Sequence, residues 1–351
     1  MISSRKRSIA GALAAAALFG ASTPAAKALV GELHPFVLAG LLYAGSGLGL
    51  SFWLVARRMT GEKFSLGIAR SALPWLAGAV VTGGVVAPSL LMFGLASTQA
   101  TVASLLLNLE SVLTALIAWC VFRENFDRRI AIGMGLIAAG GVLLSLAPGT
   151  LNAIDAGALL VAAACLFWAI DNNLTRKISS GNPIAIAAIK GLVAGTANLS
   201  LAAWSSAPWP SPGISLAAMV IGLAGYGISL VLFVVALRDL GAARTGAYFS
   251  TAPFVGVAIA IGALGEPAGL AFWVAAALMG AGVWLHVSER HEHGHTHEPL
   301  AHEHGHVHDE HHRHTHDFDW DGAEPHAHAH RHATLTHRHP HYPDIHHRHR
   351  H

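Results

Sequence analysis

The sequence predicts an all-α polytopic membrane protein followed by a polar C-terminal tail. Three observations support this. Charged residues make up only 12% of the 351-residue chain, its mean hydropathy is +0.48, and apolar stretches of about 20 residues recur between short loops. Lipid offers no partners to backbone polar groups, so such stretches must be helices. We expect ten helices, over residues 8–29, 35–56, 72–95, 99–121, 130–147, 154–174, 183–204, 214–237, 244–263 and 269–287.

Arginine and lysine gather in alternate loops. They precede the first helix at 5–7 and fill the loops at 57–70 and 123–129, whereas the opposite loops carry Lys27 as their one nearby cation. The positive-inside rule therefore predicts that both termini are cytoplasmic, and we expect a bacterial inner membrane. The first 28 residues also fit a cleavable signal peptide. Its removal would reverse the agreement with the cation pattern, so we keep this stretch as the first helix.

An internal repeat relates the two halves of the apolar region. Laying Leu95–Leu143 over Leu237–Leu285 without a gap superposes Glu124 on Glu266 and matches Leu and Gly positions in the next helix. Each half holds five expected helices, an odd number, so the two copies must enter the membrane in opposite directions. Inverted repeats of this kind are typical of transporters, in which the halves expose a central site alternately.

Small residues and prolines within the helices have a structural explanation. Glycines are frequent in the third, fifth and tenth helices, where they allow close packing in lipid. Pro24, Pro88 and Pro253 fall inside expected helices and remove backbone hydrogen bonds. We interpret both features as packing devices and tolerated kinks before direct roles in binding.

Several short motifs recur at matching places in the two halves. They are Phe19-Gly20 and Phe167-Trp168 in the opening helices, Leu109-Glu110, Arg123-Glu124 and Gly140-Gly141 in the first half, and Thr245-Gly246-Ala247-Tyr248, Ala252-Pro253-Phe254 and Gly265-Glu266-Pro267 in the second. Over residues 8–287 this pattern resembles the EamA-type exporters of the drug/metabolite transporter superfamily. The resemblance implies two five-helix repeats, at 1–147 and 148–290, followed by a tail at 291–351.

One departure from that family pattern is informative. Where the second half has Pro253, the first half has Ser111, preceded by Glu110. A carboxyl group thus enters the predicted membrane region. Together with the histidine-rich tail, this resembles the branch of the superfamily associated with nickel and cobalt resistance.

Glu110 is the most informative residue of the apolar region. It lies about ten residues from either end of its helix, near the bilayer midplane, where an unpaired ionised acid costs several kcal/mol. We interpret it as a cation or proton site, with a neutral hydrogen-bonded carboxyl as the alternative. Asn108 lies about 200° around the same helix and so faces another direction. It shares its stripe with Thr101, Ser104 and Ser111.

Further polar residues are candidates for a transport pathway. Asp171 and Asn172 end the sixth expected helix, and Lys190 lies about two turns into the antiparallel seventh, at comparable depth. A pair between Asp171 and Lys190 would either gate the inner mouth or merely neutralise two charges. Asn198, Tyr226 and Tyr248 would line the pathway or form bonds between helices.

The tail is a chemically distinct region. All histidines except His34 and His286 lie between residues 291 and 351, many at every second position. Imidazole binds nickel, cobalt and zinc, and the interspersed acids can complete a coordination shell. We expect a disordered tail that binds such metals, or attracts anionic lipid when protonated. The predicted ligands are His291, His293, His295, His297, His302, His304, His306 and His308.

These features favour a secondary exporter of divalent transition metals, nickel or cobalt first, that needs no bound cofactor. The alternatives are an exporter of amino acids or other small metabolites with a regulatory tail, and a membrane-tethered metal buffer or sensor. We find no phosphate-binding loop, no nucleophile and base set and no basic stripe with aromatics, so we expect neither ATP drive nor an enzyme nor a nucleic-acid partner. The sequence allows a homodimer in the bilayer but does not predict one.

Overall fold

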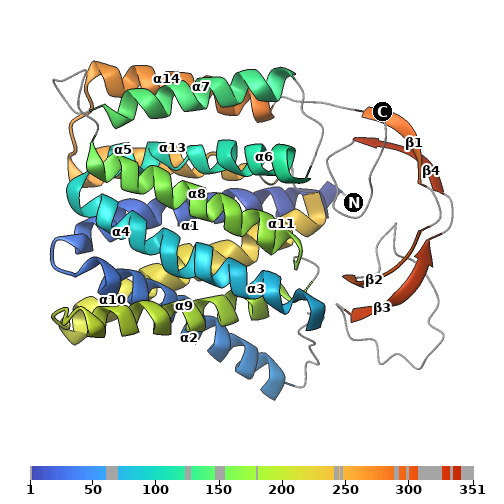
Figure 1. The fold of residues 1–351 in the computed structure, drawn as a ribbon, viewed down its shortest axis with the longest axis horizontal. Helices are drawn as coiled ribbons and strands as arrows, with labels where there is room; N and C mark the ends of the chain where they lie inside the picture. Colours follow the sequence, from blue (N-terminus) through green and yellow to red (C-terminus); the bar gives the residue numbers. More distant parts are fainter. Residues whose placement is uncertain are drawn as a thin grey trace.

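The computed structural model describes residues 2–60, 70–122, 128–146, 155–178, 181–240, 245 and 248–287 of the apolar region. In the tail it describes 292–297, 300–306, 326–332 and 335–340. Helices lie side by side along the long axis of the molecule, and both chain ends lie toward the same end of the bundle (Figure 1). We call that end proximal and the opposite end distal.

The helical elements succeed one another along the chain, and some of them follow directly without a turn. In order they are α1 (Ile2–Val30), α2 (Pro35–Met59), the 3-10 turn η1 (Arg70–Ala72), α3 (Leu73–Ala79), the π-helix η2 (Val80–Val86), α4 (Ala87–Ser97), α5 (Ala100–Leu106), α6 (Leu109–Phe122), α7 (Arg128–Ser145), α8 (Ala156–Arg176), α9 (Pro183–Trp204), α10 (Pro212–Gly222), the π-helix η3 (Leu223–Ile228), α11 (Ser229–Leu240), α13 (Ala252–Leu264) and α14 (Leu270–Val287).

The helical region has the dimensions of a multi-pass membrane protein. In the part of the chain that the structure describes, seven helical stretches are long and apolar enough to cross a membrane. Shorter apolar helices accompany them at Ala131–Ser145, Ala252–Leu264 and Leu270–Leu285. The polytopic architecture is thus confirmed, while the count of ten spans stays a prediction.

The two π-helical segments occupy corresponding places in the two halves. In the register that lays Leu95 over Leu237, η2 falls on η3. The last π-type bonds correspond as well: Ala87 N–H donates to the Thr82 carbonyl, and Ser229 N–H donates to the Ala224 carbonyl. Single π turns are rare in proteins as a whole, but those that occur are often found at functional sites. Their matching placement supports the repeat that the sequence indicates.

The fourth expected helix, 99–121, is not continuous. It breaks into α5 and α6, and tight bonds from Asn108 N to the Leu105 carbonyl and from Glu110 N to the Leu107 carbonyl, both 3.1 Å, span the break. The Asn108 amide donates to the same Leu105 carbonyl at 3.1 Å, so it competes with the helical backbone bond. Pro253 lies at the start of α13, not inside it, where a missing N–H is harmless.

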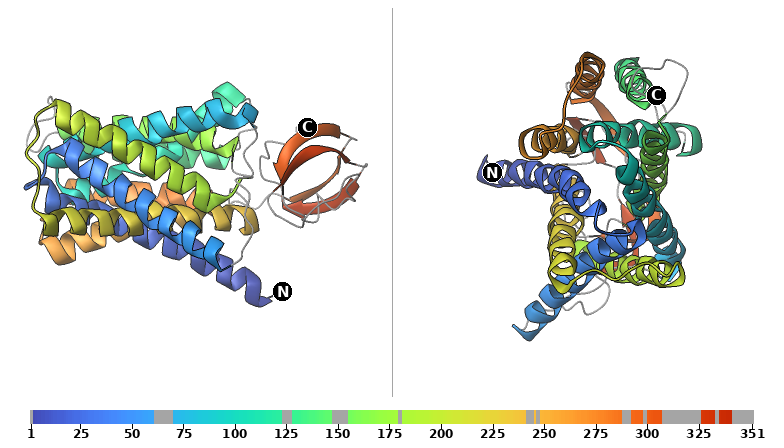
Figure 2. Two further views of the ribbon diagram at one scale, coloured as in Figure 1. Left: turned by 90° about the horizontal axis from the view of Figure 1, so that it is seen from below. Right: turned by 90° about the vertical axis from the view of Figure 1, so that its left-hand side faces the viewer.

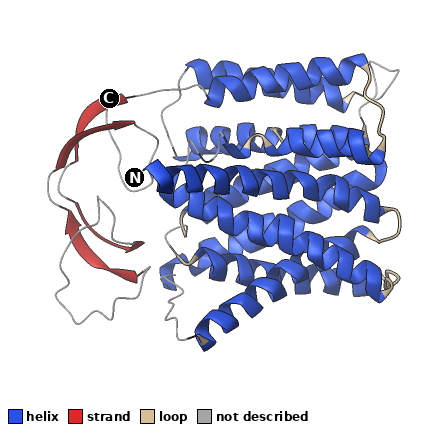
Figure 3. Cartoon of the chain, turned by 180° about the vertical axis from the view of Figure 1, so that it is seen from behind, coloured by secondary structure: helices blue, strands red, loops and turns tan. Residues whose placement is uncertain are grey.

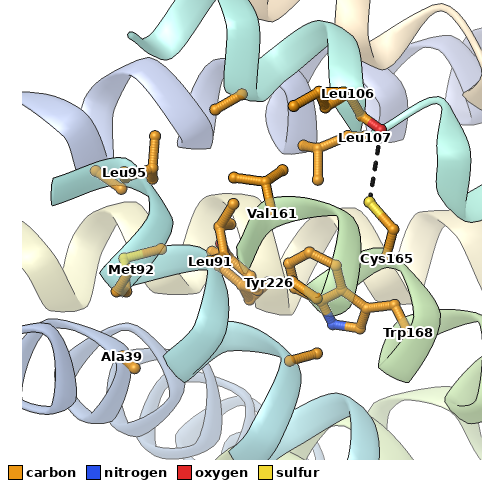
Figure 4. Packing of buried hydrophobic residues seen from close by; sticks show 14 of the residues in the cluster. Ala39, Leu91, Met92, Leu95, Leu106, Leu107, Val161, Cys165, Trp168 and Tyr226 are labelled. Atoms are coloured by element: carbon orange, nitrogen blue, oxygen red, sulfur yellow. Dashed lines mark hydrogen bonds between the residues drawn. The ribbon is translucent and has the colours of Figure 1, made fainter. Parts of the chain in front are cut away.

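Close helix packing joins the two halves. A side chain on Gly191 of α9 would lie 2.5 Å from the Gly47 amide nitrogen of α2, so only glycine permits this crossing. The end-on view shows α7 and α14 side by side at one edge of the bundle (Figure 2). Between the helices, apolar side chains of α4, α5 and α8 interlock around Trp168 and Tyr226 (Figure 4).

Four short strands lie in the tail (Figure 3). β1 (Glu292–His297) pairs antiparallel with β4 (Leu335–Pro340), and β2 (Leu300–His306) pairs antiparallel with β3 (His326–His332). The expectation of a tail without regular structure is therefore not met in these segments. Histidine at every second position has the two-residue period of a strand, which explains the difference.

Candidate functional site

Glu110 lies in the first turn of α6, directly after the break in the fourth expected helix. Its Oε1 accepts a hydrogen bond of 2.7 Å from Nδ2 of Asn172 on α8, and the same nitrogen lies 3.3 Å from Oγ1 of Thr114. The residue is only partly buried. The acid is therefore held by a neutral amide donor from the other half and is not sealed in apolar packing.

Asp171 and Lys190 form an ion pair between α8 and α9. Both residues are buried, and the second carboxylate oxygen of Asp171 accepts a 2.9 Å hydrogen bond from the hydroxyl of Thr175. The carboxylate also packs against the backbone of Gly83, at a point where any side chain would collide with it. The ion pair that the sequence suggested between Asp171 and Lys190 is thus formed, and both partners are shielded from water.

Helix α8 links these two acidic groups. Asp171 and Asn172 are consecutive and therefore project about 100° apart, one toward Lys190 and the other toward Glu110. Lys190 compensates Asp171. Among the residues that the structure describes, Glu110 forms no ion pair, so it is the carboxyl that can accept one added cation or proton.

Pro88 explains an unusual set of bonds on η2. Proline has no N–H, so the Gly83 carbonyl lacks the partner that a π-helical turn would supply at position 88. Two side chains from other helices take its place: the Tyr43 hydroxyl donates at 2.7 Å and the Trp168 indole N–H donates at 3.0 Å. The kink thereby ties α2 and α8 to one backbone atom.

Asn198 of α9 satisfies a second carbonyl near Pro88. Its Nδ2 donates to the Gly84 carbonyl at 3.1 Å, and its Oδ1 accepts a 2.8 Å bond from the hydroxyl of Ser89. The residue is fully buried. Of its two sequence-based interpretations, the structure thus gives Asn198 bonds between helices.

Aromatic rings from four elements meet beside Trp168. The Phe19 ring centroid lies 6.2 Å from that of Trp168 and 6.0 Å from that of Tyr226, and Tyr43 lies 5.3 Å from Tyr226. Within the part of the chain that the structure describes, the Tyr226 hydroxyl is buried beside Ser22 and has no partner within ordinary hydrogen-bond geometry. Because Trp168 precedes Asn172 by one helical turn, the aromatic cluster and the Glu110 region share one side of α8.

The structure separates the predicted pathway residues into two groups. Glu110, Asp171, Asn172 and Lys190 form the connected polar set, with Tyr226 in the adjoining aromatic cluster. Asn108 is buried and directed at the Leu105 carbonyl and the Met279 sulfur, away from Asn172. Tyr248 packs near the apolar residues Ala12, Ala236 and Leu240.

Sequence reasoning did not assign a site role to Phe19, Tyr43, Thr114 or Trp168. The sequence held a signal for Thr114, because it follows Glu110 by one helical turn and therefore lies on the same helix face. The aromatic residues had no such signal: their shared contact depends on helices that are distant in the sequence. Among the described residues, no three His, Cys, Asp or Glu side chains gather into a group that could hold a metal ion.

The predicted tail ligands are described only as backbone. His291 and His308 lie outside the described residues. The other six lie on β1 and β2, where the antiparallel register sets His295 opposite His337 and His304 opposite His328. The far half of the tail, which the ligand prediction omitted, thus contributes the opposing histidines.

Known proteins share this sequence pattern and fold. The model of the EamA-like transporter family matches the chain twice, at residues 6–146 and 155–288. The chain belongs to this family. An uncharacterized transporter of Methanothermobacter thermautotrophicus is 28% identical over 289 residues, which is 78% of this chain and 84% of the relative.

A second curated relative and a solved structure are also similar to this chain. The uncharacterized transporter YyaM of Bacillus subtilis is 24% identical over 223 residues, 58% of this chain and 71% of the relative. A crystal structure with a TM-score of 0.61 and 18% identity covers 80% of this chain and 96% of its own, and shows the fold alone. The chain is therefore a multi-pass membrane transporter of the drug/metabolite transporter superfamily.

Proposed function

We propose that this protein is a secondary exporter that carries a cation past Glu110, with divalent nickel or cobalt as the cargo. The single observation that carries the proposal is the state of Glu110: a partly exposed acid in the membrane region, held by Asn172 and unpaired with any cation among the described residues. We further propose an inner-membrane location with both termini cytoplasmic, in line with the distribution of arginine and lysine.

An acid at this depth is suited to exchange. A carboxylate in a low-dielectric region is stabilised by a bound cation or by a proton, and the two compete for the same oxygens. Asn172 orients the group without neutralising it. Lys190 neutralises Asp171, so Glu110 is the carboxylate of this polar set that supplies negative charge to the cation. Cation release on one side and protonation on the other would couple export to a proton gradient, with the two halves alternating in access.

The tail supports a transition metal as the cargo. Its imidazoles prefer nickel, cobalt and zinc over the hard cations calcium and magnesium. In an antiparallel pair, residues directly opposite have Cβ atoms about 5 Å apart, a spacing at which two side chains can reach one ion. The strand register sets histidine opposite histidine at 295 and 337 and at 304 and 328, and this backbone placement supports the proposed capture of metal by the tail.

A second candidate cargo is an amino acid or another small metabolite with an ammonium group. The aromatic cluster favours it, because the ring faces of Phe19, Tyr43 and Tyr226 attract organic cations. The lack of a group of three metal-binding side chains among the described residues points the same way. In this case the tail would regulate transport.

Uptake into everted vesicles tests these proposals, with nickel, cobalt and amino acids compared side by side. We expect metal uptake that is lost in Glu110→Gln and kept in Glu32→Gln, which changes an exposed distal carboxyl. Amino-acid uptake without metal uptake would establish the second candidate and overturn the first.

A chain truncated at Glu289 separates the tail from the membrane site. Metal flux that persists without the tail places recognition in the bundle. If the full chain binds metal but moves neither metal nor amino acids, and Glu110→Gln changes nothing, the protein is a membrane-tethered buffer or sensor and the export proposal fails.

A further inference from the structure

Lys27, near the end of α1, binds the end of α4 on the distal side. Its Nζ donates to the carbonyl oxygens of Leu95 at 2.6 Å and of Thr98 at 2.8 Å. The last carbonyls of a helix lack partners of their own, so an ammonium group satisfies them. These bonds explain why the distal side keeps a lysine that the charge pattern of the other distal loops does not favour.

Glu266 binds the start of α5, the helix that follows α4. It lies between α13 and α14, and its two carboxylate oxygens accept hydrogen bonds of 2.8 Å from Ala100 N and 2.7 Å from Thr101 N. The first amides of a helix have no partners within it. One carboxylate from the second half therefore holds both leading amides of α5 in the first half.

Asp155 ties a third element to the same place. Its Oδ1 caps α8 by accepting bonds from Gly157 N at 2.7 Å and Ala158 N at 3.1 Å, and its Oδ2 accepts a 3.1 Å bond from the Thr98 hydroxyl. We call Lys27, Asp155 and Glu266, with the α4–α5 connection that they bind, the distal clamp.

The clamp controls a short rigid segment. α5 has seven residues, with the clamp at its start and the helix break at Leu107 and Asn108 at its end. We expect α5 to swing about that break if the clamp releases, because at the break short bonds between residues three apart replace the regular helical bonds. The segment lies directly over Cys165 of α8, whose sulfur is 3.5 Å from the Leu106 carbonyl (Figure 4).

We propose that the distal clamp is the gate that closes the distal side of the transport route, and that its release swings α5 and opens the Glu110 site to that side. Among the described residues, the three charged groups bind backbone groups and the Thr98 hydroxyl and not each other, so each can be removed without leaving an opposite charge unpaired. This inference rests on transport past Glu110 and not on the identity of the cargo.

The reactivity of Cys165 tests the gate. Cys165 is buried, whereas Cys120 is exposed, so a Cys120→Ser background leaves one reporter thiol. A cationic, membrane-impermeant methanethiosulfonate is added to right-side-out and to everted vesicles. In Glu266→Gln we expect labelling at least about tenfold faster from the distal side only, because the change weakens a charge-assisted bond. Lys27→Gln should act alike, and Lys27→Arg should restore slow labelling.

Matched variants exclude general loosening. Glu32→Gln removes an exposed distal carboxyl outside the clamp and should leave labelling unchanged. If Glu266→Gln does not fold, Thr98→Val deletes only the hydroxyl bond to Asp155 and should accelerate distal labelling by a smaller factor. Unchanged labelling in folded variants, or equal acceleration from both sides, would overturn the gate. Since no cargo is used, this result is independent of the flux assays.

Discussion

Replacing Lys190 by Met should destabilise the bundle strongly, whereas the double change with Asp171→Asn should restore most of the loss. The two side chains are 8% and 6% exposed, so little water can reach a charge left alone. After Lys190→Met, Asp171 keeps only the hydroxyl of Thr175 as a described donor. Removing one partner of a buried pair costs about 3–5 kcal/mol, but replacing both partners is often close to neutral.

Thermal unfolding in detergent measures this difference. For a chain of this size roughly 2 °C corresponds to 1 kcal/mol, so Lys190→Met should lower the midpoint by about 6–10 °C. The monodisperse fraction after heating, followed by size-exclusion chromatography, gives the midpoint for both single variants and the double variant. Lys177→Met, which changes an exposed residue, is the control. A loss below about 2 °C in Lys190→Met, or no recovery in the double variant, would refute the reasoning.

Three further outcomes follow from the contacts around α8 and α9. Trp168→Phe keeps a ring but removes the donor to Gly83, so stability should fall by about 1 kcal/mol; an unchanged midpoint in the same heating assay would contradict that bond. Asn198→Ala removes the side-chain donor of the Gly84 carbonyl, while Ser89 keeps its bond to the Val85 carbonyl, which should cost about 1–3 kcal/mol with unaltered cargo preference; a change of preference in the vesicle assay would instead make Asn198 a pathway residue. Gly191→Val should abolish folded protein on size-exclusion chromatography, since its side chain would enter the α2 backbone, and normal yield would rule out that crossing.

The sequence predicted those features that depend only on hydrophobic periodicity and on the distribution of charge. Apolar stretches and alternate basic loops predicted a polytopic bundle, and antiparallel register placed Asp171 and Lys190 at one depth, where they pair. The depth of Glu110 near the bilayer midplane rests on counting residues within one span and stays a prediction.

Other features depend on contacts that local sequence does not encode. The break before Glu110 contains neither glycine nor proline, and it became evident only through the Asn108 side-chain bond. Pro88 was readable as a kink, but the capture of the Gly83 carbonyl needs Tyr43 and Trp168 from helices far along the chain. In the tail, composition led to an expectation of disorder, and the two-residue period of the histidines was not used to predict the strands that the structure contains.

Gly83 shows how a residue without a side chain can govern electrostatics. The Asp171 carboxylate rests in the space that a methyl group at this position would fill, and the carbonyl of the same residue anchors two aromatic side chains. Even alanine at position 83 would therefore push the acid out of line with its lysine partner while leaving every charged residue intact. Charge balance inside this bundle is sensitive to steric bulk as much as to charge itself.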